Sequence, residues 1–321
     1  MGSKVEWPIK NVGVNHKDFV TIADYSTGEI MALLQDALQM KKLQKAGKAD
    51  PVLAGKVLGM IFEKSSTRTR VSFEVGMLQM GGHAIFLSSK DIQLGRGESI
   101  SDTAKVLSRY VDGIMIRTFE HSKVEELAYH ATVPVINGLS DLHHPAQVLA
   151  DLLTILEKKG KLAGLKLSYI GDGYNNMTHS LMEGAAKVGM DIAVACPMGY
   201  EPNQQITNQA KQFAKQMGSS VIVTSDPVEA IQNADVIVTD VWTSMGMEEE
   251  AEKRLKDFES YQVNKELCSH AKSDYIFLHC LPAHRGEEVT SEIIDGPHSV
   301  VFDEAENRLH AQKAILKALI K

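Results

Sequence analysis

Short apolar runs with the composition of buried strands alternate with helix-like patterns along almost all of this 321-residue chain. Val57–Phe62 is a nearly continuous apolar run, as expected of a strand covered on both faces. The segment Thr67–Met80 instead places Phe73, Met77 and Met80 on one face of a helix. Strands that are joined by helices pair in parallel, because a parallel connection needs a long crossover. The sequence therefore predicts parallel sheets with helices on both faces.

The alternation continues in both halves of the chain. The further strands that we expect are 84–87, 113–118, 134–136, 165–170, 192–195, 221–223, 236–239 and 275–278. The further helices that we expect are 101–110, 124–131, 145–157, 177–188, 206–217 and 227–233. Since 321 residues exceed the usual size of one core, we predict an α/β fold of two doubly wound, Rossmann-like domains, 1–147 and 148–304. Ligands of such folds bind beyond the carboxyl ends of the strands, so we expect the active site in the cleft between the domains.

Composition and charge exclude several classes of protein. The net charge of -7 argues against nucleic acid as the main partner, because binding to phosphate backbones requires a basic surface. No apolar run has the length that a membrane span needs, and Met1–Glu6 has no apolar signal region. The spacing of Cys196, Cys268 and Cys280 matches neither a disulfide framework nor a zinc motif. We therefore expect a cytoplasmic globular protein that associates with neither membranes nor nucleic acid.

A cluster of hydroxyl and basic residues, Glu63–Arg70, follows the first buried strand directly. Ser and Thr are preferred at helix N-caps, where free N–H groups form an anion site. Arg68 and Arg70 add forked donors that suit a phosphate. The alternative is an ordinary capped helix with surface arginines. The coincidence of strand, cap and arginines favours a phosphate site.

A second cluster, His143–Gln147, begins the helix at 145–157. Pro145 suits the first helical position, so His144 and Gln147 are expected at the mouth of that helix. Arg117, at the end of the strand 113–118, adds a cation at the same level of the fold. The alternatives are an ordinary capped helix and an exposed arginine at a strand end. Neither the cluster His143–Gln147 nor Arg117, taken alone, distinguishes a binding site from these alternatives.

Two loops follow strands of the second half. Asp240–Gly246 offers a carboxylate and a glycine-containing loop, which suits an amine ligand but also an ordinary turn. Gly171–Asn176 resembles the start of a dinucleotide-binding loop, but Asn176 stands where that motif requires glycine. A dehydrogenase that binds a nucleotide is therefore disfavoured.

Cys280 lies where the strand 275–278 ends, and Pro282 redirects the chain two residues later. A titratable thiol at the end of a buried strand is a candidate for chemistry. By itself, however, a cysteine in an apolar segment is more often a small core side chain.

In combination, four motifs resemble the aspartate/ornithine carbamoyltransferase family in their order and spacing. They are Ser66–Arg70, His144–Gln147, Asp240…Ser244–Gly246 and His279–Pro282. The resemblance covers nearly the whole chain. The first two motifs are shared with the aspartate-specific members, whereas the Ser-Met-Gly loop and the cysteine motif point to the ornithine-specific members.

The resemblance implies a domain 1–147 that binds carbamoyl phosphate, onto which a C-terminal helix 305–321 packs, and a domain 148–304 that binds ornithine. It implies that Ser66, Thr67, Arg68 and Thr69 hold the phosphate, that Arg117 and His144 polarise the carbamoyl oxygen, and that Gln147 holds the amide. The further residues that it assigns to carbamoyl phosphate are Arg308, Cys280, Leu281 and, from a neighbouring subunit, Gln93. A homotrimer, or a multiple of trimers, with shared active sites is therefore expected.

L-ornithine is expected to bind to Asn176, Asp240, Ser244 and Met245, and L-citrulline and phosphate are the expected products. The amine must attack as the neutral base, and its pKa near that of lysine makes deprotonation at pH 7 cost about 4–5 kcal/mol. By the same resemblance Asp240 and Cys280 flank the amine, so the expected catalytic residues are Cys280, Asp240, Arg117 and His144. We expect Cys280 to take part in proton handling, not nucleophilic attack, and we expect no metal or organic cofactor. A carbamoyltransferase for putrescine or another amine, and a non-catalytic relative, are the alternatives.

Overall fold

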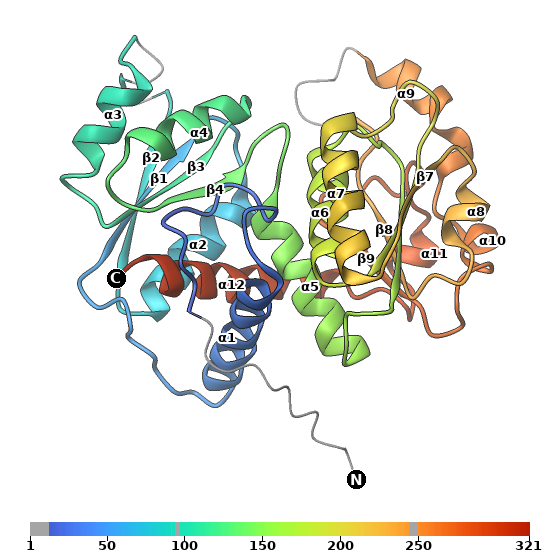
Figure 1. The fold of residues 1–321 in the computed structure, drawn as a ribbon, viewed down its shortest axis with the longest axis horizontal. Helices are drawn as coiled ribbons and strands as arrows, with labels where there is room; N and C mark the ends of the chain where they lie inside the picture. Colours follow the sequence, from blue (N-terminus) through green and yellow to red (C-terminus); the bar gives the residue numbers. More distant parts are fainter. Residues whose placement is uncertain (1–12, 91, 94–96, 244–249) are drawn as a thin grey trace.

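The computed structural model describes residues 13–90, 92–93, 97–243 and 250–321. Within these residues it contains two parallel sheets, with the strand orders β2-β1-β3-β4 and β7-β6-β5-β8-β9 (Figure 1). The first sheet consists of β1 (Val57–Phe62), β2 (His83–Ser88), β3 (Gly113–Arg117) and β4 (Val135–Leu139). The second consists of β5 (Lys166–Ile170), β6 (Asp191–Ala195), β7 (Val221–Thr224), β8 (Val236–Thr239) and β9 (Ile276–His279). The predicted fold class, two doubly wound α/β units, is confirmed.

Helices connect and cover the strands. They are α1 (Thr27–Lys45), α2 (Thr67–Gln79), α3 (Ile100–Leu107), α4 (His121–His130), α5 (Pro145–Lys159), α6 (Asn176–Lys187), α7 (Gln204–Met217), α8 (Pro227–Ile231), α9 (Ala251–Asp257), α10 (Lys265–Cys268), α11 (Ser291–Ile294) and α12 (Val301–Leu319), with a 3₁₀ turn, η3, at Glu259–Tyr261. Each strand that we predicted is present, with small shifts at its ends. Each predicted helix is present too, and α4 begins three residues earlier than its apolar pattern indicates because its first turn is polar.

Helix α1 is absent from our predictions, although the sequence carries a signal for it. Ser26 caps the helix and Glu29 bonds back to the backbone of Ser26, which is a complete capping box. The helix buries Ile30, Leu33 and Leu34 against α5 and α12. Fully burying a side chain of this kind contributes about 1.5–3 kcal/mol, so tertiary packing stabilises a helix with a weak amphipathic pattern.

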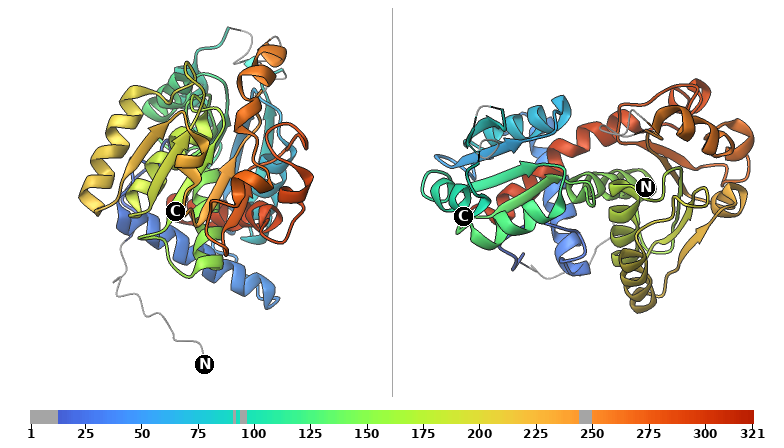
Figure 2. Two further views of the ribbon diagram at one scale, coloured as in Figure 1. Left: turned by 90° about the vertical axis from the view of Figure 1, so that its right-hand side faces the viewer. Right: turned by 90° about the horizontal axis from the view of Figure 1, so that it is seen from above.

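Helices α5 and α12 form the junction between the two sheets. They pack against each other, and α12 continues along α1 and α2 beside the first sheet (Figures 1 and 2). Gly76 of α2 lets α12 approach, since a Cβ there would lie 3.3 Å from Lys313 Cγ. One continuous core of buried apolar side chains extends from α1 through α5 into β5 and β6. This shared core fixes the two halves relative to each other.

The strand orders locate the point where a ligand is expected. In the first sheet the order reverses between β1 and β3, and in the second between β5 and β8. The carboxyl ends of strands at such reversals bind ligands in open α/β sheets. Phe62 of β1 lies opposite Arg117 of β3 in the register, which places the residues after both strands together.

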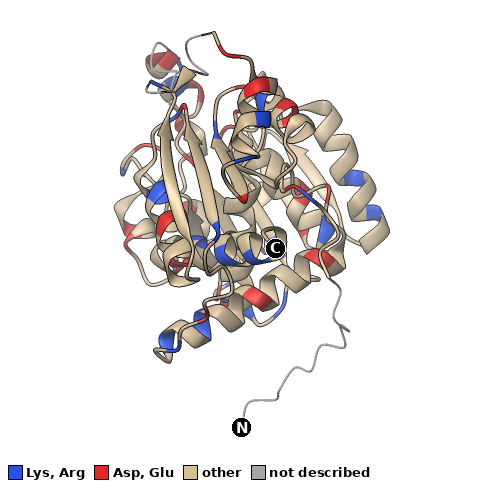
Figure 3. Cartoon of the chain, turned by 90° about the vertical axis from the view of Figure 1, so that its left-hand side faces the viewer, with Lys and Arg blue, Asp and Glu red and all other residues tan. Residues whose placement is uncertain are grey.

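The surface carries charges of both signs. Figure 3 shows Lys and Arg interspersed with Asp and Glu over the elements of the first sheet. Among the described residues, no helix is long and apolar enough to cross a membrane.

Candidate functional site

A cavity of about 650 Å³ opens where the carboxyl ends of the two sheets face each other. Its lining comes from both sheets and includes Ser66, Thr67, Arg68, Arg117, His144, Asn176, Asp240, Cys280, Leu281 and Arg308. Seven of these ten residues come from the four predicted motifs, and the other three, Arg117, Asn176 and Arg308, were predicted beside them, so predictions from distant parts of the chain surround one space. Lys64, which we did not predict as a site residue, lines it too, and its buried ammonium pairs with Asp141.

The first wall of the cavity is the N-terminus of α2. Ser66 is the N-cap, and its Oγ accepts a hydrogen bond of 3.2 Å from the Thr69 backbone N–H. The free N–H groups of this first turn and the helix dipole favour an anion. Thr69 itself is fully buried behind this turn, where its Oγ1 accepts from Arg308 Nη2 at 2.7 Å.

Three guanidinium groups, from Arg68, Arg117 and Arg308, line the same side of the cavity. Arg68 donates to the Leu281 carbonyl at 2.6 Å and so joins the two sheets. Among the described residues, Arg117 Nε and Arg308 Nε have no hydrogen-bond partner. Burial and the charge of Arg308 lower the pKa of Arg117 to about 9, so it remains a cation at neutral pH. Buried cations with unused donors are costly without a counter-ion, so this wall is suited to a multiply charged anion.

His144 is the N-cap residue of α5 and is almost completely buried. Its backbone N–H donates to Ser180 Oγ at 2.9 Å, and its Nδ1 has no partner among the described residues. Burial, together with Arg308 and Arg117, lowers the pKa of His144 well below its ordinary value. At neutral pH the ring is therefore uncharged, and it serves as a hydrogen-bond donor or acceptor at the cavity wall.

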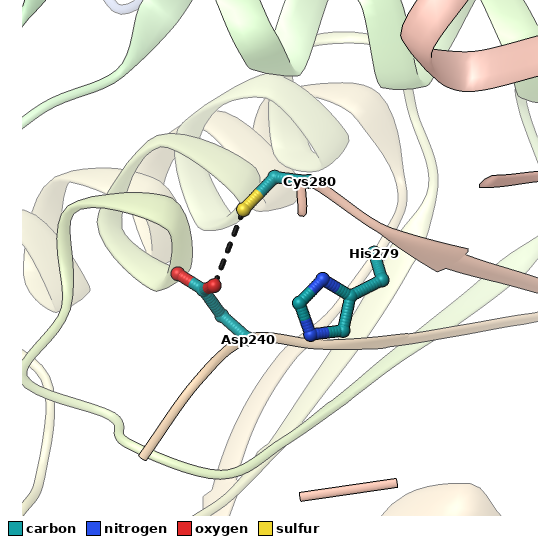
Figure 4. Close-up of side chains that lie close together, drawn as sticks. All are labelled: Asp240, His279 and Cys280. Carbon is teal, nitrogen blue, oxygen red and sulfur yellow. Dashed lines mark hydrogen bonds between the residues drawn. The ribbon is translucent and has the colours of Figure 1, made fainter. Parts of the chain in front are cut away.

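The cavity is also lined by a carboxylate and a thiol. Cys280 Sγ donates to Asp240 Oδ1 at 3.2 Å, and Figure 4 shows the two side chains pointing toward each other from the ends of β9 and β8. The Val241 backbone N–H donates to the same oxygen at 2.8 Å, and Asn175 Nδ2 donates to Oδ2 at 3.2 Å. Burial and the neighbouring Asp240 raise the pKa of Cys280 well above its ordinary value. The thiol is therefore neutral in the absence of a bound cation.

Asp240, His279 and Cys280 bring three potential metal-ligating atoms within 4.8 Å of one another. Both nitrogens of His279 are engaged, however. Nδ1 accepts from the Leu281 N–H at 2.9 Å, and Nε2 lies 3.1 Å from Glu288 Oε1. His279 thus holds the backbone of Leu281, whose φ is +58°, instead of offering a nitrogen to an ion. The arrangement fits a structural role for this imidazole.

Other parts of the protein pack closely against the loop Gly171–Asn176. A Cβ on Gly173 would lie 2.4 Å from the Tyr200 carbonyl, so glycine is needed for packing, not for the approach of a ligand. Asn175 caps α6, and Asn176 Nδ2 donates to the Ser140 carbonyl at 2.8 Å across the junction. This geometry is unsuited to a pyrophosphate and keeps Asn176 at the cavity edge.

Five predicted residues lie apart from the cavity wall or outside the described residues, and Thr69, buried behind the first turn of α2, is one of them. Gln147 is buried behind Arg308, which donates to its Oε1. Gln93 is exposed, follows the edge strand β2 and does not line the cavity. Ser244 and Met245 lie outside the described residues.

The family models, the similar sequences and the similar structures all point to the same protein family. The family model "Aspartate/ornithine carbamoyltransferase, carbamoyl-P binding domain" matches residues 17–157, and "Aspartate/ornithine carbamoyltransferase, Asp/Orn binding domain" matches residues 163–319. The ornithine carbamoyltransferases of Anoxybacillus flavithermus and Bacillus subtilis are each 63% identical over 304 residues, which are 95% of this chain and 96% and 94% of theirs. The structure of ornithine carbamoyltransferase from Pyrococcus furiosus superposes with a TM-score of 0.93 at 57% identity, covering 96% of this chain and 98% of that one.

Proposed function

This chain belongs to the aspartate/ornithine carbamoyltransferase family and is an ornithine carbamoyltransferase, and on that premise we propose which residues carry each part of the reaction. The enzyme transfers the carbamoyl group of carbamoyl phosphate to the side-chain amine of L-ornithine, with L-citrulline and phosphate as products. One observation carries the assignment of roles. We call the N-terminus of α2 together with Arg68, Arg117 and Arg308 the anion wall. The anion wall and the Asp240–Cys280 pair face the same cavity, so an anionic donor and an amine acceptor can meet there.

The phosphate of carbamoyl phosphate binds at the N-terminus of α2, to Ser66, Thr67, Arg68 and Thr69, with Arg308 beside them. The capping geometry of Ser66 and the unused Arg308 Nε support this assignment. These cations and N–H groups also stabilise the charge that accumulates on the leaving phosphate, because they are fixed before the reaction begins.

Arg117 and His144 polarise the carbamoyl oxygen. Arg117 remains charged and carries an unpaired Nε, while the uncharged His144 ring donates a hydrogen bond without adding a second charge. The backbone at Cys280 and Leu281 completes this half of the site. Gln147 supports it from behind through Arg308.

The amine of ornithine binds between Asp240 and Cys280, with Asn176 at the cavity edge and Ser244 and Met245 as further contacts. Asp240 accepts from the ammonium and orients it toward the carbonyl carbon. The ammonium first loses one proton, which Asp240 accepts and passes to solvent. The neutral amine nitrogen then forms a bond to that carbon as the bond to the phosphate oxygen breaks, and a second amine proton leaves to the phosphate. Cys280 positions the amine and shares its proton; no covalent bond to sulfur is needed, because carbamoyl phosphate is already activated.

Several expectations from the sequence belong to the same proposal. Gln93 extends from an exposed segment and serves the site of a neighbouring subunit, in a homotrimer or a multiple of trimers. The first domain, 1–147 with the C-terminal helix, binds carbamoyl phosphate, and 148–304 binds ornithine. A cytoplasmic location agrees with the three free cysteines.

Citrulline formation from carbamoyl phosphate and L-ornithine tests the activity, and putrescine is the matched alternative acceptor. The same assay with Arg117→Ala tests the carbonyl assignment. We expect rapid turnover of ornithine and negligible turnover of putrescine. Equal turnover of the two amines would contradict ornithine as the acceptor.

A further inference from the structure

Two buried carboxyl groups lie behind the cavity, where α5, α12 and the end of β9 meet. Asp151 of α5 is fully buried and Glu304 of α12 is 1% exposed. Neither lines the cavity, and the division of roles above uses neither. A buried ionised carboxylate is costly unless its oxygens are paired, so these two groups need an explanation.

The first arm of this network leads to Arg308. Gln147 Nε2 donates to Asp151 Oδ1 at 2.8 Å and to Glu304 Oε1 at 3.0 Å. Both amide protons of Gln147 are thereby used, which fixes the orientation of its carbonyl oxygen. That oxygen accepts from Arg308 Nη1, and Arg308 Nη2 donates to Thr69 at 2.7 Å. The guanidinium at the anion wall is therefore held in place by the two carboxyl groups through one glutamine.

The second arm leads to the amine side of the cavity. Glu304 Oε2 accepts from the His279 backbone N–H at 2.8 Å. His279 is the last residue of β9, and its imidazole holds the Leu281 N–H. The position of Cys280 between them is thus tied to the same carboxyl pair.

In the part of the chain that the structure describes, the hydrogen bonds leave one oxygen of the two carboxyl groups without an N–H donor, and that oxygen is the place for a proton. Asp151 Oδ1 and both oxygens of Glu304 accept from N–H donors, whereas Asp151 Oδ2 has no partner among the described residues. A proton on that oxygen gives it a donor role toward Glu304 and leaves Glu304 ionised opposite Arg308. Burial raises the pKa of both carboxyl groups, which favours retention of one proton by the pair at neutral pH.

We propose that Asp151 and Glu304 are positioning residues that share one proton, carried by Asp151, and jointly orient Arg308 and the Cys280 end of β9. This inference rests on the proposed function. It assigns different roles to the two groups: Asp151 acts through Gln147 on the carbamoyl phosphate side, and Glu304 acts on both sides.

The two isosteric substitutions distinguish this proposal from simple packing. In Asp151→Asn the side-chain amide replaces the protonated oxygen, so its Nδ2 donates to Glu304 and its oxygen still accepts from Gln147. In Glu304→Gln the new NH₂ faces an N–H donor, either that of Gln147 or that of His279. Packing alone predicts equal effects from the two changes, because each preserves shape.

A matched control lies one turn farther along the same helix pair. Thr154 of α5 accepts a hydrogen bond of 2.9 Å from Asn307 of α12. Thr154→Ala breaks this contact between α5 and α12 without touching Gln147, Asp151 or Glu304. It reports how much of any effect comes from a loosened helix interface.

The experiment is steady-state citrulline formation by wild type, Asp151→Ala, Asp151→Asn, Glu304→Gln and Thr154→Ala, with thermal unfolding of each. Loss of one buried hydrogen-bonding partner gives changes of about 10–100-fold. Asp151→Ala is expected to raise KM for carbamoyl phosphate by that factor with little change in KM for ornithine, and Asp151→Asn to restore it to within about 3-fold. Glu304→Gln is expected to raise the same KM and also lower kcat about 10–100-fold.

Equal effects of Asp151→Asn and Glu304→Gln would overturn the proposal, as would the same kinetic changes in Thr154→Ala. If Asp151→Ala fails to fold, the comparison of the two isosteric variants still decides the matter. The proposed function fails separately, if the wild-type protein forms no citrulline.

Discussion

The carboxylate of Asp240 is the group whose removal should most selectively affect the amine side of the site. Its Oδ1 accepts from Cys280 at 3.2 Å and from the Val241 N–H at 2.8 Å, and its Oδ2 accepts from Asn175. Asp240→Asn keeps the shape, removes the negative charge and turns one oxygen into an NH₂ that faces a donor. Both changes act on the ornithine ammonium and leave the anion wall intact.

The magnitude follows from the charge and its surroundings. A charge-assisted hydrogen bond to the ammonium contributes about 1.5–3 kcal/mol, and two unit charges about 4 Å apart interact by about 4 kcal/mol at an effective dielectric constant near 20. These are two descriptions of one interaction, so a loss of about 3–4 kcal/mol corresponds to a decrease of about 100–1,000-fold in kcat/KM for ornithine. Binding of carbamoyl phosphate should change by less than about 3-fold, since we propose that arginines, and not Asp240, neutralise its charges.

The assay is steady-state citrulline formation with ornithine varied, combined with equilibrium binding of carbamoyl phosphate or a phosphonate analogue. Asp235→Asn is the matched control, because Asp235 directly precedes β8, is equally buried and pairs with Lys272 at the end of the sheet away from the cavity. The control should lose stability and keep its kinetic constants. A decrease in phosphonate affinity as large as the decrease in kcat/KM for ornithine would refute the reasoning.

Three further predictions address other parts of the site and the fold. Cys280→Ser should lower turnover through the amine while equilibrium binding of carbamoyl phosphate stays within about 3-fold of wild type; an equal loss of that affinity would contradict the role given to the thiol. Arg68→Ala should largely abolish binding of a phosphonate analogue in titration calorimetry, and near-normal affinity would remove Arg68 from the site. Burial lowers the pKa of His179 to about 4, so the unfolded state binds a proton that the folded state does not as pH falls below about 6.5. The free energy of unfolding in urea should therefore decrease by about 1.4 kcal/mol from this residue between pH 7.5 and 5.5, and His179→Gln should lose less stability over that range than wild type; an identical pH dependence of the two proteins would contradict this.

The alternation of strands and helices was predictable because strands buried on both faces must be nearly continuous in apolar residues. Val57–Phe62 and Val236–Thr239 match their predicted bounds for this reason. Helix α1 was missed because its apolar face is weak and much of its stability comes from α5 and α12, which are distant in sequence. Only its capping box, Ser26 with Glu29, is readable locally.

The site shows the same division between local and distant information. Ser66 and His144 stand at helix starts, and helix starts after parallel strands converge, so local patterns suffice to place them in one cavity. The pairing of Cys280 with Asp240 joins residues 40 positions apart on neighbouring strands, and spacing alone cannot indicate a hydrogen bond. Gln147 was expected at the ligand and instead lies behind Arg308, because a partner 161 residues away occupies its oxygen.

The central claim is that the anion wall and the Asp240–Cys280 pair serve one reaction in one cavity. The most direct measurement is the affinity of a bisubstrate analogue, in which a phosphonoacetyl group replaces carbamoyl phosphate and is joined to the side-chain nitrogen of L-ornithine. Because one molecule would engage both walls, the account predicts binding at least about 100-fold tighter than that of the phosphonate half alone, and about 10-fold weaker binding to Asp240→Asn than to wild type. An analogue that binds no more tightly than the phosphonate half would contradict the claim.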